Sequence, residues 1–106
     1  METEASIDDL RRAVEGLHAC LASHRETVQV REDFKGQTVW DGVIHVFDLK
    51  GHPKAKLAYS WSSPVEGSDR RKFYAVLHLP PVDSPEAAVR AAIVADHKKP
   101  RRELDD

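Results

Sequence analysis

The stretch RKFYAVLHLPPVDSPEAAVRAAIVAD, residues 71–96, holds a strand, a turn and a helix in direct succession. Between Phe73 and Leu79 every second residue is apolar, which is the period of a pleated strand with one apolar face. Pro80 and Pro81 have no N–H to donate to a sheet, so we expect the strand to end before them. The stretch therefore predicts the last strand and the last helix of the chain.

The same stretch indicates where its helix begins. Ser84 is expected to cap the helix, and Pro85 to fill its first position. The negative charge of Glu86 should interact favourably with the partial positive charge at this end of the helix. From 87 to 95 the residues are almost all Ala, Val and Ile, which predicts a helix with a wide buried face. The residues expected on that face are Ala88, Val89, Ala92 and Ile93.

A second amphipathic pattern, near the amino terminus, predicts a helix from Ile7 to Ser23. Ser6 and Asp9 have the spacing of a capping box, with Asp in place of the usual Glu. Apolar residues repeat every three or four positions and should form one buried stripe. They are Ile7, Leu10, Val14, Leu17 and Leu21.

Three further strands are expected between the helices. A short one lies within 26–34, and a Lys-Gly turn leads from it into a long one at 38–49. The long strand is apolar at both odd and even positions. Either it is covered on both faces, or a bulge at Gly42 changes the face that it buries. The remaining strand occupies 55–61.

The loop around Gly67 joins this last strand to the one that contains Phe73. If the hairpin is centred on that loop, the large apolar residues of both strands lie on one side of the sheet. The predicted pairs are Trp61 with Phe73, Tyr59 with Ala75, Leu57 with Leu77, and Ala55 with Leu79. A slip by one residue would move each of them to the other face.

The predicted fold is α+β, with an amino-terminal helix, a four-stranded antiparallel meander and a carboxy-terminal helix in a two-layer sandwich. The element order is α-β-β-β-β-α. We expect a single domain at 1–97 and a disordered charged tail at 98–106. The sequence leaves open whether both helices pack on the same face of the sheet.

Composition sets the outer limits. A chain of 106 residues is long enough for one domain with its own core, and its formal charge of −2 favours no class of partner. The single cysteine, Cys20, excludes an intrachain disulfide and suits a reducing compartment. No apolar run approaches the roughly 20 residues that span a bilayer, and the acidic start is unlike a signal peptide. We therefore expect a cytoplasmic protein that does not enter membranes.

No motif for catalysis or metal binding stands out. The six histidines lack the close ligand pairs that are typical of zinc sites. Cys20 lies beside an apolar stripe, where a lone cysteine is usually a small hydrophobe. Ser60, Ser62 and Ser63 lack the turn of a nucleophile elbow. We expect no metal, no cofactor and no catalysis, with a small enzyme that has an unrecognised site as one alternative.

A nucleic-acid (RNA)-binding domain is the other alternative. Basic clusters lie at 70–72 and 98–102, and aromatic residues on the strands are candidates for base stacking. The order of helix, antiparallel sheet and helix is similar to that of double-stranded-RNA-binding domains. That family carries a glycine-rich turn and lysines that grip phosphate before the last helix, whereas Asp83 and Glu86 reverse the charge here. The aromatic candidates are Trp40, Tyr59, Trp61 and Tyr74.

The favoured hypothesis is an interaction module that binds a second copy of itself or a partner protein through an apolar sheet face. If both helices cover one face, the other face keeps an exposed apolar patch, which monomers rarely carry without a use. If the helices take one face each, or a bulge turns Trp40 inward, no patch remains. The predicted contact residues are Trp40, Ile44, Val46, Tyr74 and Val76, with Arg70, Arg71 and Lys72 at the rim.

Overall fold

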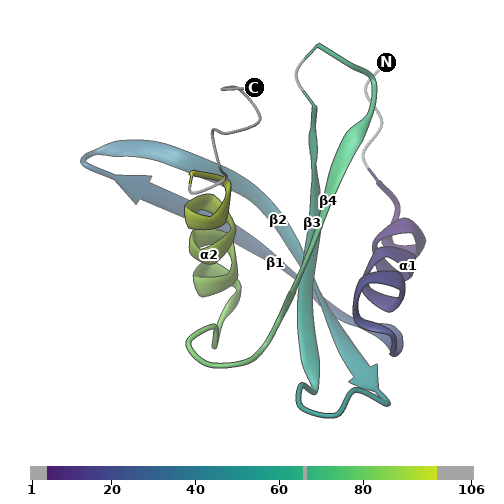
Figure 1. Ribbon diagram of the computed structural model, residues 1–106. Helices are drawn as coiled ribbons and strands as arrows, with labels where there is room; N and C mark the ends of the chain where they lie inside the picture. The colour runs from purple at the N-terminus through teal and green to yellow at the C-terminus, as the bar shows by residue number, and fades with distance from the viewer. Residues whose placement is uncertain (1–4, 66, 98–106) are drawn as a thin grey trace, which may run out of the picture.

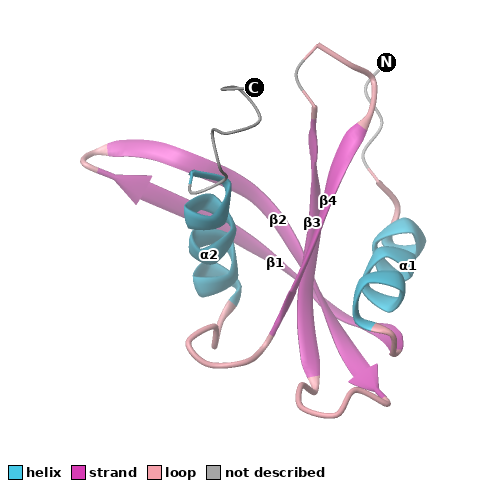
Figure 2. Cartoon of the chain, in the orientation of Figure 1, coloured by secondary structure: helices cyan, strands magenta, loops and turns pink. Residues whose placement is uncertain are grey.

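The computed structural model describes residues 5–65 and 67–97. The four strands form one antiparallel sheet in the order β1-β2-β3-β4, with one helix before them and one after them (Figures 1 and 2). The predicted α+β class and order of elements are confirmed. The tail predicted at 98–106 lies outside the described residues. The elements are α1 (Ile7–His18), β1 (Leu21–Phe34), β2 (Gln37–Lys50), β3 (Leu57–Pro64), β4 (Arg71–Leu77) and α2 (Pro85–His97).

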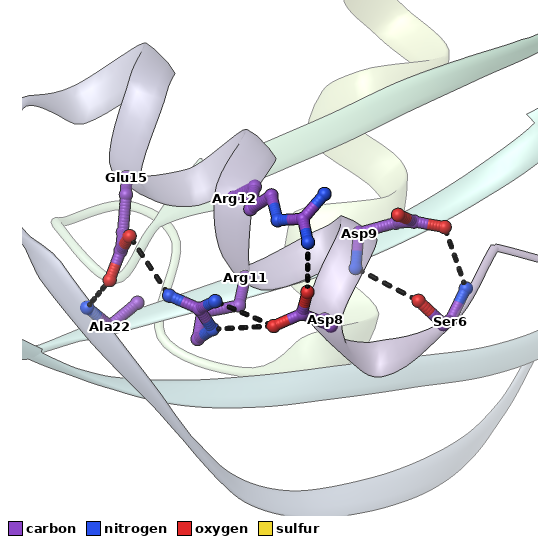
Figure 3. A network of polar contacts seen from close by, with 7 residues as sticks. All are labelled: Ser6, Asp8, Asp9, Arg11, Arg12, Glu15 and Ala22. Carbon is purple, nitrogen blue, oxygen red and sulfur yellow. Dashed lines mark hydrogen bonds and ion pairs between the residues drawn. The ribbon is translucent and has the colours of Figure 1, made fainter.

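The amino-terminal end of α1 is closed by the predicted capping box. Ser6 Oγ accepts a hydrogen bond from the Asp9 N–H at 3.0 Å, and the Asp9 carboxylate accepts one from the Ser6 N–H at 3.2 Å (Figure 3). These two bonds satisfy N–H groups that have no partner inside the helix. The capping box therefore fixes the start of α1 at Ile7.

The helix ends earlier than predicted. Ala19 adopts a left-handed conformation with φ of 52°, and the chain then enters β1. Of the five residues in the predicted stripe, Leu10 and Val14 are buried, whereas Ile7, Leu17 and Leu21 are exposed. The predicted stripe was therefore wrong at both ends: Ile7 and Leu17 lie in the first and last turns of the short helix, and Leu21 belongs to β1.

β1 and β2 form a long hairpin whose register shifts twice. Arg25 is an extra residue on β1, and Val39 is an extra residue on β2. Gly42, in contrast, lies in a stretch of uninterrupted pairing, so the bulge considered there is absent. The turn is Lys35-Gly36, with φ of 53° and 79°, as the tight turn of a hairpin requires.

The two helices cover opposite faces of the sheet (Figure 1). On one face of β2, Ile44 and Val46 pack in a core with Val89 of α2. On the other face, Phe47 packs in a second core with Leu10 of α1. The long strand is therefore apolar on both sides because both sides are covered.

The pairing of β3 with β4 is one residue away from the predicted register. Trp61 lies opposite Tyr74 and stacks on it, with ring centroids 4.9 Å apart. Phe73, predicted opposite Trp61, pairs with Ser62 and is exposed. The prediction was wrong because it placed all large apolar residues on one face, whereas the structure buries apolar residues on both.

The start of α2 agrees with its sequence signals. Ser84 Oγ accepts a hydrogen bond from the Ala87 N–H at 3.1 Å, and Pro85 is the first helical residue. Ala88 and Val89 are fully buried, as predicted for the face toward the sheet. Small alanines on this face let the helix approach the strands closely.

Because the helices cover opposite faces of the sheet, shortening a buried side chain on either face of β2 should destabilise the protein. Ile44 and Phe47 are each 0% exposed, so Ile44→Ala and Phe47→Ala should each lower the free energy of unfolding by about 2–5 kcal/mol. Val43 is 41% exposed, and Val43→Ala should cost no more than about 1 kcal/mol. Urea unfolding measures all three. Equal stability of Phe47→Ala and Val43→Ala would contradict the placement of α1.

Candidate functional site

β2 and β3 pair along only part of their length. His45–Asp48 pairs with Leu57–Ser60, and residues 37–44 of β2 have no partner on β3. β2 continues to pair with β1, and β3 continues to pair with β4, so the sheet opens into two diverging hairpins (Figure 1). This divergence leaves a cleft in the middle of the sheet.

The cleft encloses about 250 Å³. Asp41 and Val43 of β2 line one wall, and Ser62 of β3 with Arg71 of β4 lines the other. Trp40 and Trp61 also line it, and their rings meet edge to face with centroids 6.0 Å apart. The two tryptophans thus join the hairpins on the side of the sheet that α2 covers.

The backbone of β2 directs hydrogen-bonding groups into this cleft. The Leu49 N–H donates to the Lys56 carbonyl at 2.9 Å. The backbone N–H and C=O groups of odd-numbered residues in this part of β2 therefore point toward β3. By the same alternation, Asp41 and Val43 point their N–H and C=O groups into the cleft. Among the described residues, no strand pairs with them on that side.

The opposite wall is closed by a side chain. Arg71 donates from Nε to Ser62 Oγ at 2.8 Å and from Nη2 to the Ser62 carbonyl at 3.2 Å. The guanidinium therefore takes the place that a neighbouring strand would take along β3. The open edge of the cleft belongs to β2.

α1 covers backbone groups at the outer strands. His18 Nε2 donates to the Ala75 carbonyl of β4 at 2.8 Å. Glu15 accepts from the Ala22 N–H of β1 at 2.9 Å and is itself held by Arg11 at 3.1 Å (Figure 3). These contacts occupy one backbone group on each outer strand. Unpaired groups along a strand edge are a template to which a further strand can add.

The five predicted contact residues do not form an exposed patch. Ile44 and Val46 are buried beneath α2, and Tyr74 and Val76 are partly buried against the same core. The predicted patch is absent because α2 covers this face of the sheet. Of the five, Trp40 alone lines the cleft.

The predicted basic rim is also divided. Arg71 lies in the cleft, whereas Lys72 forms an ion pair with Asp96 of α2 at 3.1 Å. Arg70 is exposed in the loop before β4. These three cations therefore do not border one surface.

A second hollow of about 650 Å³ lies where the tip of the β1–β2 hairpin meets the end of α2. It continues the apolar face of the sheet beyond the helix. An ion pair between Arg90 and Glu32 at 3.1 Å borders it. Its apolar lining consists of Phe34, Val39, Ile93 and Val94.

Comparison with models of protein families, with curated proteins and with solved structures finds no match to this chain. In the described part of the chain, no helix is long and apolar enough to cross a membrane.

Cys20 has the properties of an unactivated thiol. Burial raises its pKa, and the Glu15 carboxylate raises it further. A smaller fraction of the Cys20 thiol is then ionised near neutral pH than of an ordinary thiol, and the thiolate is the form that reacts. Iodoacetamide should therefore alkylate Cys20 more slowly than it alkylates glutathione. Glu15→Gln should restore part of the rate. Alkylation faster than that of glutathione would indicate an activated nucleophile and would support the enzyme alternative.

Proposed function

We propose that the protein is a non-enzymatic interaction module that binds an extended segment of a partner protein along the open edge of β2. The supporting observation is that Asp41 and Val43 direct backbone donors and acceptors into the cleft where β3 has diverged. An extended segment satisfies such groups by adding a strand, and its backbone hydrogen bonds supply affinity.

The dimensions of the cleft favour a short segment. A volume of about 250 Å³ between two hairpins of the same sheet favours a short extended segment over the larger hairpin of a second copy. Successive side chains of a strand point to opposite faces. One set would approach Trp40 and Trp61, and the other would approach Ala5 and Leu10 on the side of the sheet that α1 covers. The expected segment therefore carries apolar residues.

The placement of the aromatic residues favours this proposal over RNA binding. Tyr59 and Trp61 are 3% and 2% exposed, so their rings are not offered to bases. Tyr74 is stacked on Trp61 and donates its hydroxyl to Asp96 at 2.9 Å. The aromatics that a base-stacking surface would use are part of the core.

The test uses a proline on the open edge. Because the Val43 N–H points into the cleft, Val43→Pro should leave the ladder to β1 intact while blocking a strand at the open edge. The probe is a phage-displayed library of random short peptides selected on the wild-type protein. We expect selected peptides to carry apolar residues and to lose at least about tenfold in affinity for Val43→Pro, because a backbone hydrogen bond and close approach are both lost.

Gln29→Pro is the matched control. Gln29 pairs directly with Val43, so its own N–H points away from β2, toward the outer edge of the same hairpin. This variant places the same substitution at the outer edge of the hairpin, but it also removes the hydrogen bonds that Gln29 Nε2 donates to Asp41 Oδ1 at 3.1 Å and to the Gly42 carbonyl at 3.0 Å. Gln29→Ala removes the same two bonds without a proline and is measured beside it. Gln29→Pro should bind the peptides like Gln29→Ala. Failure to select any peptide, or equal binding by Val43→Pro and Gln29→Pro, would overturn the proposal.

A further inference from the structure

Three polar side chains of the β1–β2 hairpin converge on one another. His24 Nε2 lies 3.3 Å from His45 Nδ1. Thr27 Oγ1 lies 3.1 Å from the first nitrogen and 3.0 Å from the second. Each of the three atoms is therefore within about the same distance of the other two. The hydroxyl oxygen has lone pairs, and each imidazole offers a lone pair at its contacting nitrogen in the tautomer that carries its proton on the other ring nitrogen.

The bulge at Arg25 creates this cluster. Positions three apart in a regular strand face opposite sides of the sheet, so His24 and Thr27 would not meet. The extra residue changes the alternation, so that His24 pairs with Phe47 and Thr27 pairs with His45, two β2 positions on the same face. Bulges commonly re-aim side chains in this way next to functional sites.

We propose that His24, Thr27 and His45 bind a divalent transition-metal ion of the kind that imidazole favours, such as Zn²⁺. With metal–nitrogen bonds of about 2.0–2.1 Å, ligand atoms are ~3.3 Å apart in a tetrahedron and ~2.9 Å apart at neighbouring corners of an octahedron. The three separations here fall between these values. An ion placed over the triangle would replace the hydrogen bonds that its corners now share.

The surroundings suit an ion with open coordination positions. His24 and Thr27 are exposed, and His45 is half-buried and lines the cleft. An ion there would keep positions for water or for an oxygen or nitrogen of a bound partner. Arg25, the nearest cation along the chain, is paired with Asp48 at 2.8 Å, which offsets its repulsion of a bound ion.

The site contains a hydroxyl in place of a third imidazole, thiolate or carboxylate. Within 5–65 and 67–97, no group of three or more His, Cys, Asp and Glu side chains is placed to hold a metal ion. The proposed site has two imidazoles, and its third corner is a hydroxyl.

Calorimetric titration of the tag-free chain with Zn²⁺ near neutral pH tests the proposal. We expect a single ion per chain with a Kd in the micromolar range or tighter. His24→Asn and His45→Asn should each weaken binding by at least about tenfold, in line with the loss expected when a ligand or its support is removed. Binding should also weaken at mildly acidic pH, because protons compete for imidazole.

His52→Asn is the matched control for loss of a histidine. His52 Nδ1 accepts hydrogen bonds from the N–H groups of Lys54 and Ala55 at 3.1 and 2.9 Å, and an asparagine oxygen can accept the same bonds. This variant should bind Zn²⁺ like the wild type. Absence of binding, or equal loss in all three histidine variants, would overturn the proposal.

Two readouts identify the site independently of the proposed peptide. Zn²⁺ should shift the imidazole proton resonances of His24 and His45, and leave those of His52 in place. Val43→Pro should bind Zn²⁺ unchanged, because its side chain is not a ligand. Zinc-induced shifts confined to other histidines would also contradict the assignment.

Discussion

The constraint on which this structure depends is that β2 buries both of its faces, each beneath a different helix. Ile44 packs toward α2 and Phe47 packs toward α1. A strand that is apolar on both sides loses its stabilising burial if either cover is removed. The helices therefore take opposite faces, and the apolar surface that two helices on one face would have left open is filled.

The same arrangement decides which backbone groups are covered. α1 reaches β1 through Glu15 and β4 through His18, so it protects strands that are far apart in the sheet order. β2 and β3 meet only near the helix-covered centre and then diverge, because β2 follows its long partner β1. The cleft at Asp41 and Val43 is thus a consequence of unequal strand pairing, and Arg71 closes only its β3 side.

Local signals were sufficient to predict much of the fold. The capping box at Ser6, the Ser84-Pro85 helix start and the Lys35-Gly36 turn each act within a few residues, and the structure confirms them. The register of β3 on β4 and the split of the sheet depend on partners far along the chain, which periodicity does not specify. The cluster of His24 with His45 was missed for the same reason, since it arises from a bulge at Arg25 that no turn residue announces.

The proposed binding of an extended segment requires that β2 carries an open edge in the cleft. Amide hydrogen exchange followed by NMR on the free protein tests it most directly, because each N–H of β2 points either to β1 or into the cleft. We expect fast exchange at the amides of Asp41 and Val43 and slow exchange at those of Gly42 and Ile44, which point toward β1. Equal protection at all four amides would show that the edge is already paired, and would contradict the proposal.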